Sequence, residues 1–161
     1  MKFSVLCGVL VLGLVSRAAM AGGDTDPSCL SNGVELAANN EQVVQWKKST
    51  ANQFLARGHV TGTVSQVYPD KNGHKHFEIH LDTPAGDPLE IVYNVSFGGL
   101  PTIQKGMSVE ACGDYITSNQ ATAQYPASPD GGILHWIHKS PKPSGHASGY
   151  VEIDNVIYGG D

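Results

Sequence analysis

Three histidines and a tryptophan lie within one short segment near the C-terminal end of the chain. Residues 131–149 read GGILHWIHKSPKPSGHASG and contain His135, Trp136, His138 and His146. Imidazole is a good ligand for first-row metal ions, and its charge can change near neutral pH. The segment therefore indicates a functional site, and any prediction of function depends on what the fold places beside it.

The spacing of His135 and His138 limits what this pair can do alone. Residues 133–138 have strand character, and side chains of a strand alternate between its two faces. Two residues three positions apart then point in opposite directions. Both rings can reach one metal ion only if the chain turns between them.

A metal site would therefore need groups from elsewhere. His146 follows the Pro- and Gly-rich stretch 141–145, which can fold back, and His74 is the best donor outside the segment. Asn94 or Asp114 could add an oxygen ligand. The predicted ligands of a possible divalent ion such as zinc are His135, His146 and His74.

Two other interpretations remain open. The histidines could form a structural hydrogen-bonded network, or a functional site without a metal. Trp136 and Tyr150 could be a platform for a ring-shaped ligand or could pack in the core. His76 and His80 are expected to be solvated. The predicted ligand-binding residues are His74, Asn94, His135, Trp136, His138, His146 and Tyr150.

The N-terminus reads as a signal peptide. Lys2 precedes an apolar run over residues 3–15, and Ala19-Met20-Ala21 is a cleavage pattern, which predicts a signal peptide at residues 1–21. We expect an exported protein, periplasmic or secreted, with no membrane span.

The mature chain is acidic. Loss of residues 1–21 leaves 8 basic and 15 acidic residues, a net charge of about −7 with histidine neutral. This argues against generic binding to nucleic acid, which needs a basic surface. Two cysteines remain, Cys29 and Cys112, and in an oxidising compartment they are expected to form one disulfide.

The elements expected from the pattern are one helix and several short strands. The window 35–55 is helical in period, with Asn39-Asn40 as a possible break and Gly58 as its C-terminal cap. From His59 the period changes to two.

Strands expected over 59–67, 74–82, 89–95 and 107–117, with a glycine in the first, predict a small OB-fold-like closed barrel with an N-terminal helix. A β-sandwich is the alternative. The predicted organisation is a signal peptide at 1–21, an N-terminal tail and helix at 22–57, and the barrel at 58–161.

The chain also resembles an uncharacterised family of small exported bacterial domains of unknown function. That family carries a G-G-[VI]-[IL]-H-W-x-H signature, which is present here over residues 131–138. His74, Asn94 and the run 113–115 match further family positions, and the resemblance extends over residues 58–158. It implies a shared site near His74, Asn94, His135, His138 and His146, and implies no reaction.

Three positions depart from the family pattern. Tyr93 replaces a histidine that often precedes the asparagine, Lys75 replaces a glutamine, and Ser140 replaces an aspartate. If Tyr93 stands in place of a ligand, a metal site is harder to sustain.

Two functions from different classes follow. The favoured one is a binding module for an unknown small-molecule, saccharide or protein ligand on a barrel face. The alternative is a metal-assisted or His-based hydrolase acting outside the cytoplasm, possibly a phosphodiesterase, with histidine as ligand or general acid/base. Fold analogy does not decide between them.

Overall fold

The computed structural model describes residues 27–142 and 144–160, so the predicted signal peptide lies outside the described residues. Its elements, in chain order, are β1 (Leu30–Ser31), β2 (Val34–Glu35), α1 (Asn40–Ser49), β3 (Leu55–Val67), β4 (His74–Leu81), β5 (Pro88–Asn94), the 3₁₀ helix η1 (Val95–Phe97), β6 (Ser108–Thr117), β7 (Gly132–His135), β8 (Tyr150–Ile153) and β9 (Val156–Tyr158).

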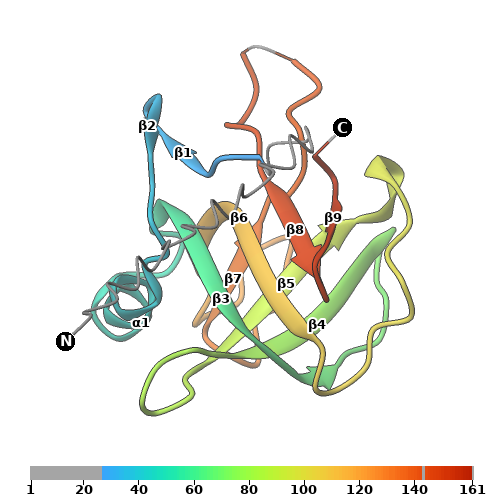
Figure 1. The fold of residues 1–161 in the computed structure, drawn as a ribbon. Coiled ribbons are helices and arrows are strands. Elements are labelled where there is room, and N and C mark those ends of the chain that lie inside the picture. Colours follow the sequence, from blue (N-terminus) through green and yellow to red (C-terminus); the bar gives the residue numbers. More distant parts are fainter. Residues whose placement is uncertain (1–26, 143, 161) are drawn as a thin grey trace, which may run out of the picture.

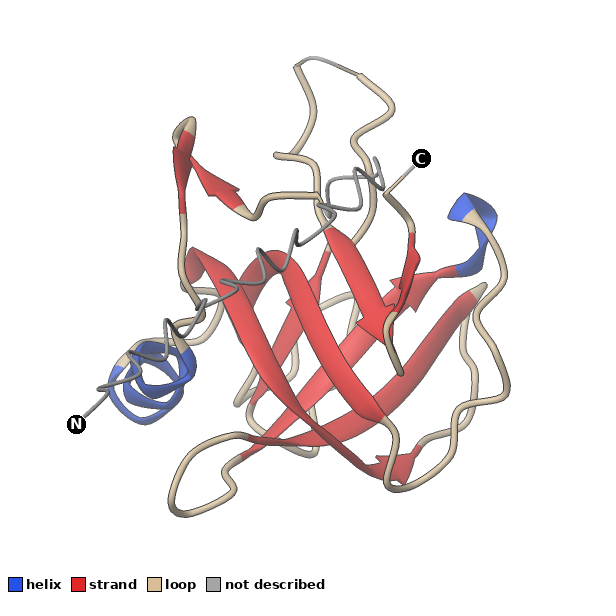
Figure 2. Cartoon of the chain, in the orientation of Figure 1, coloured by secondary structure: helices blue, strands red, loops and turns tan. Residues whose placement is uncertain are grey.

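Five of these strands form a closed barrel (Figures 1 and 2). Their order is β3-β4-β5-β7-β6, and β6 pairs with β3 again. All neighbours in the barrel are antiparallel except β5 and β7, which run parallel. Strands β8 and β9 extend the sheet outward from β6. The expected small closed barrel with one helix is confirmed, and the β-sandwich alternative is wrong because β3 pairs with strands on both sides.

Strand β3 closes the barrel because it is long enough to serve two neighbours. Residues 55–63 pair with β6, and residues 62–67 pair with β4. Gly62 pairs in both ladders, opposite Leu81 and opposite Val109. A Cβ at Gly62 would overlap the carbonyl oxygen of His80. The absence of a side chain at this position allows the strands to approach where β3 changes partner.

Helix α1 lies across one end of the barrel (Figure 2). Its buried Val43 and Val44 belong to the core cluster, and the Trp46 ring lies 5.7 Å from that of Tyr115. The helix is tied at its start by Asn40, which donates to the carbonyl oxygen of Thr61 at 3.1 Å. This helix covers the end where β6 finishes and β7 begins, so the opposite end carries the start of β4 and the ends of β5 and β7.

The predicted helix over 35–55 is wrong at both ends. Glu35 belongs to β2, and Gly58 lies within β3 rather than capping a helix. The reason is tertiary: Asn39 accepts a hydrogen bond from the backbone N–H of His59 at 2.9 Å, and Leu55 pairs with β6. These contacts set where the helix starts and place the end of the predicted helix in strand β3.

The expected disulfide is confirmed. Cys29 and Cys112 are bonded, with Cα atoms 5.5 Å apart, and both are buried. The bond joins the N-terminal segment to the middle of β6. Cys29, Cys112 and Tyr150 form a second small cluster beside the main core. Among the described residues no helix is long and apolar enough to cross a membrane.

We predict that Gly62→Ala lowers the free energy of unfolding by about 1–3 kcal/mol, the usual cost of overpacking. The added methyl group would displace the His80 carbonyl or bend β3 where the barrel closes. The measurement is urea unfolding of the oxidised protein. Gly99→Ala is the matched control, because nothing lies within 4 Å of its Cβ position. Equal stabilities for the two variants would contradict this account of closure.

Candidate functional site

Three strand ends meet at the end of the barrel opposite α1. Strand β4 begins with His74, whose register partner on β5 is Asn94, the last residue of that strand. Strand β7 runs parallel to β5 and ends at His135. Because a parallel pair finishes on the same side, both strands deliver their last residues beside the start of β4. The fold therefore brings His74 and His135 together from positions 61 residues apart.

The chain turns sharply after His135. Trp136 has a φ of +52°, in the left-handed region that bulky residues rarely adopt. Such strain persists only where the surroundings impose it, and it is common at functional sites. The turn ends the strand alternation after His135, so the opposite directions that strand geometry would give His135 and His138 no longer apply.

The turn gathers four imidazole rings, which we call the histidine cluster: His74, His135, His138 and His146. The ring centroids of His74 and His135 are 5.4 Å apart, and those of His138 and His146 are 4.6 Å apart. Two aromatic rings border the cluster. Phe97 stacks on His138 at 3.5 Å, and Trp136 stacks on His146 at 5.8 Å.

Three of the four rings are held by backbone carbonyls. The Nδ1 atom of His74 bonds to Asn72 O at 2.9 Å. The Nδ1 atoms of His138 and His146 bond to the carbonyl oxygens of the residues that follow them, at 2.9 and 2.8 Å. A carbonyl can only accept, so each Nδ1 carries the proton and each Nε2 has a free lone pair. This tautomer is also the one that metal-ligating histidines adopt through their outer partners.

The cluster favours neutral imidazole. Burial, and then the neighbouring rings of His74, His138 and His146, together lower the pKa of His135 to about 4. Burial also lowers the pKa of His138, although its bond to the Lys139 carbonyl opposes the shift. Both rings are uncharged at pH 7, so the cluster is suited to offering lone pairs rather than to attracting anions.

The ring separations suit a shared ion. Two imidazoles bound through nitrogen to one tetrahedral zinc, at Zn–N distances of about 2.0–2.1 Å, place their centroids roughly 5 Å apart. The two close pairs in the cluster have this separation. Over residues 27–142 and 144–160, no group of three His, Cys, Asp or Glu side chains is already arranged to hold a metal ion. Closing such a site requires the rings to rotate or the loop that carries His146 to shift.

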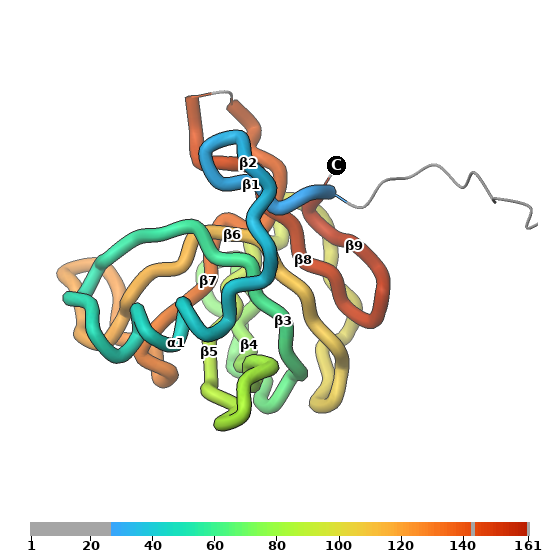
Figure 3. Tube along the Cα trace, turned by 60° about the vertical axis from the view of Figure 1, so that its left-hand side comes forward, coloured from blue at the N-terminus to red at the C-terminus, as the bar shows by residue number. Residues whose placement is uncertain are grey.

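Arg57 is a positioning residue that the sequence patterns did not reveal. Its side chain is only 8% exposed, and its Nη1 donates to Asp114 Oδ1 at 2.9 Å. It also donates to the carbonyl oxygens of Ala147 and Ser148, in the loop that carries His146, and to Leu30 O at 3.1 Å. Figure 3 shows the β1–β2 hairpin beside this loop. One cation thus joins the barrel wall, the N-terminal hairpin and the histidine-bearing loop.

Three candidate residues take structural positions. Asn94 caps η1, accepting from the backbone N–H of Ser96 at 3.0 Å. Asp114 forms an ion pair with Arg57. Tyr150 is buried, its ring lies 6.3 Å from that of His59, and its hydroxyl donates to Glu110 at 2.6 Å.

The surroundings of His76 differ from the prediction that its ring is solvated. Its Nδ1 lies 2.7 Å from the buried Glu90, so it is paired rather than solvated, whereas His80 is 57% exposed. The partnership was invisible in the sequence because Glu90 lies on the neighbouring strand.

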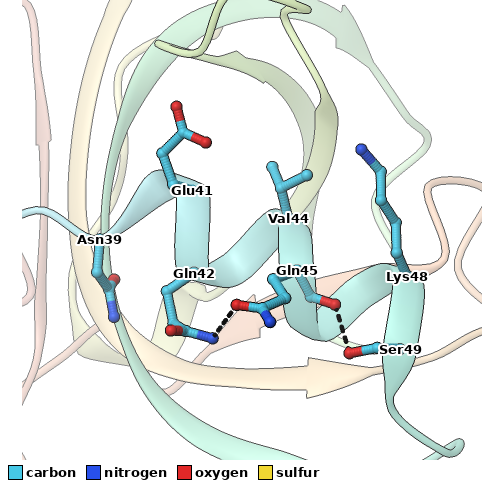
Figure 4. A pocket seen from close by; sticks show the side chains of 7 residues that line it. All are labelled: Asn39, Glu41, Gln42, Val44, Gln45, Lys48 and Ser49. Atoms are coloured by element: carbon cyan, nitrogen blue, oxygen red, sulfur yellow. Dashed lines mark hydrogen bonds between the residues drawn. The ribbon is translucent and has the colours of Figure 1, made fainter.

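Surface hollows do not indicate another site for this chemistry. A broad hollow follows the exposed side of α1, where Gln42 donates to Gln45 (Figure 4). It is lined by α1 and its N-cap residue and holds none of the histidines. A smaller cleft of about 210 Å³ lies between the β3–β4 hairpin and residues 100–103, with His76 at its border.

The fold and the cluster define a small closed β-barrel with an imidazole site at one end. Over residues 28–159 the chain matches the family described as protein of unknown function (DUF3465), and it belongs to that family. No curated protein and no solved structure shows significant similarity to it. The match covers the whole barrel, the histidine cluster and both bonded cysteines.

We predict that Arg57→Gln loosens the histidine-bearing loop and lowers the free energy of unfolding by about 2 kcal/mol, since it leaves the part-buried Asp114 without its cation. Hydrogen exchange of peptides spanning residues 140–149 should become faster. The exposed Lys105→Gln is the charge-matched control. Unchanged exchange in the Arg57 variant would show that other contacts hold the loop.

Proposed function

We propose that this protein is a binding module whose site is the histidine cluster, and that its ligand is a divalent transition-metal ion such as zinc. The observation that carries the proposal is the set of three rings whose Nδ1 atoms are occupied by carbonyls. The ring of His74 lies beside the neutral ring of His135, and the rings of His138 and His146 lie beside each other. Borderline metal ions are the ligands that several neutral imidazoles bind in common.

The position of the rings also supports binding. His74 and His135 come from the rigid barrel, whereas His138 and His146 come from the segment after the Trp136 turn. A preformed pair on strands and a second pair on a loop can close around an ion by a small movement of the loop. The half-exposed His146 leaves an open approach to the site.

The hydrolase alternative has less support. A histidine acting as general base is normally oriented by a carboxylate. Among the described residues none of the four cluster rings is hydrogen-bonded to a carboxylate. The imidazoles that do have such a partner, His59 with Glu110 and His76 with Glu90, lie outside the cluster. We therefore infer binding rather than hydrolysis.

We also propose that the protein works outside the cytoplasm. The buried Cys29–Cys112 disulfide supports this, because such bonds persist in oxidising compartments. The N-terminal sequence pattern supports export independently of the bond.

The prediction is that tag-free mature protein binds about one equivalent of Zn²⁺, and that His138→Ala or His146→Ala weakens binding at least 10-fold, as loss of a ligand does. Isothermal titration with Zn²⁺ gives both affinity and stoichiometry. His80→Ala is the matched control, because this histidine is 57% exposed and lies outside the cluster.

The variants also separate binding from folding. Each should retain the wild-type far-ultraviolet circular dichroism, and the half-exposed His146 is the variant least able to disturb packing, since His138 is buried against Phe97. Absence of Zn²⁺, Cu²⁺ and Ni²⁺ binding by the wild-type protein would overturn the proposal. So would equal losses of affinity in the His80 control and the cluster variants.

A further inference from the structure

A second group of titratable side chains lies on the outer face of β4, outside the histidine cluster. The hydroxyl of Tyr68, just after β3, is 3.0 Å from Glu78 Oε2. The same hydroxyl is 3.1 and 3.2 Å from the two carboxylate oxygens of Asp130, which precedes β7. Glu78 and Asp130 also lie within hydrogen-bonding reach of each other. Asp130 thus meets two residues of the distant β3–β4 hairpin through one phenol and two carboxyl groups.

Glu78 and Asp130 have too few hydrogen-bond donors around them for both to be ionised. Tyr68 has one proton, which can be donated to one acceptor at a time. Ser65 donates to Glu78 Oε1 at 2.5 Å, so Glu78 is better supplied than Asp130. Two facing carboxylates in a partly buried place repel each other unless one proton lies between them. The arrangement is best satisfied when Asp130 keeps its proton and shares it with the better supplied Glu78.

Charged groups on the neighbouring elements do not neutralise the two carboxyl groups in place of that shared proton. Lys47 of α1 faces both carboxyl groups, but its Nζ donates to Pro88 O at 2.5 Å. His80 lies 3.4 Å from Glu78 and is mostly exposed. Glu90 of β5 adds further negative charge beside Asp130. The exposed His80 ring is therefore shared with solvent, and the half-buried Lys47 amine is directed at a carbonyl oxygen.

We propose that Glu78 and Asp130 form a proton-operated latch that holds the loop of residues 119–131 against the barrel. Within the described chain, the hydrogen bonds of this loop go mainly to itself and to the adjoining strand ends. The backbone N–H of Gln120 also donates to Asn52 at 3.3 Å. Asp130 accepts from Tyr68, which ties the C-terminal end of the loop to the β3–β4 hairpin.

The direction of the pH effect follows from the pair. Burial, and then the facing Glu78, raise the pKa of Asp130 to about 7. Burial opposes ionisation of Glu78 as well, but hydrogen bonds from Ser65, Asp130 and Tyr68 outweigh it and lower its pKa. When the loop opens, Asp130 returns to the ordinary carboxyl range near 4 and releases the proton. Closure is therefore favoured at the acidic end and lost as pH rises from that range through about 7.

Hydrogen exchange of residues 119–131, corrected for intrinsic rates, tests the latch between pH 5 and 8.5. In the wild-type protein the opening equilibrium should rise by up to about tenfold per pH unit until about pH 7 and then level off, because one proton is released. Asp130→Asn and Glu78→Gln each remove the charge repulsion and should flatten this dependence. Asp82→Asn, at an exposed aspartate, should leave it unchanged.

Two further results separate the latch from other causes. His80→Gln should retain the wild-type dependence, and its loss there would assign the switch to the His80–Glu78 pair and overturn the proposal. Carboxyl ¹³C NMR titration of the wild-type protein should show Asp130 titrating near 7. Titration of Asp130 near 4, or pH-independent exchange of the loop, would also overturn it. None of these readouts depends on metal binding.

Discussion

Strand β3 hydrogen-bonds to β6 along its first part and to β4 along its last, and this double pairing closes the barrel. The change of partner occurs at Gly62, where a side chain would overlap the His80 carbonyl. Closure gives the barrel two distinct ends. Helix α1 covers one of them, and the other receives the first residue of β4 and the last residue of β7. The location of the histidine cluster is thus a consequence of how β3 is shared.

The segment after β7 is held by covalent, ionic and conformational constraints acting together. The Cys29–Cys112 bond fixes the N-terminal segment to β6, and Arg57 joins that segment to Asp114 and to the histidine-bearing loop. Trp136 turns the chain in a conformation that bulky residues avoid. Ordering this loop costs conformational entropy. The Arg57 hydrogen bonds and the disulfide offset that cost from outside the histidine cluster, so the Nε2 atoms of the rings need not do so.

Much of the barrel was predictable because local patterns agree with the tertiary structure there. Alternation over residues 74–81 and the Asn72-Gly73 turn predicted β4 and its hairpin. One disulfide was expected from two cysteines in a chain predicted to be exported. The helix was overextended because good helix formers continue past residues that β2 and β3 recruit. Pairing energy outweighed weak helical propensity at those positions.

The residue types at the site, the strand periods and the need for a turn between His135 and His138 follow from local sequence alone. The turn at Trp136, the Arg57 contacts and the pairing of Glu78 with Asp130 do not. Arg57 contacts residues 57 and 90 positions away, and Glu78 and Asp130 are 52 positions apart, so these partners meet only when the barrel closes. A period reports which face a side chain occupies, whereas strand order decides which other side chains share that face.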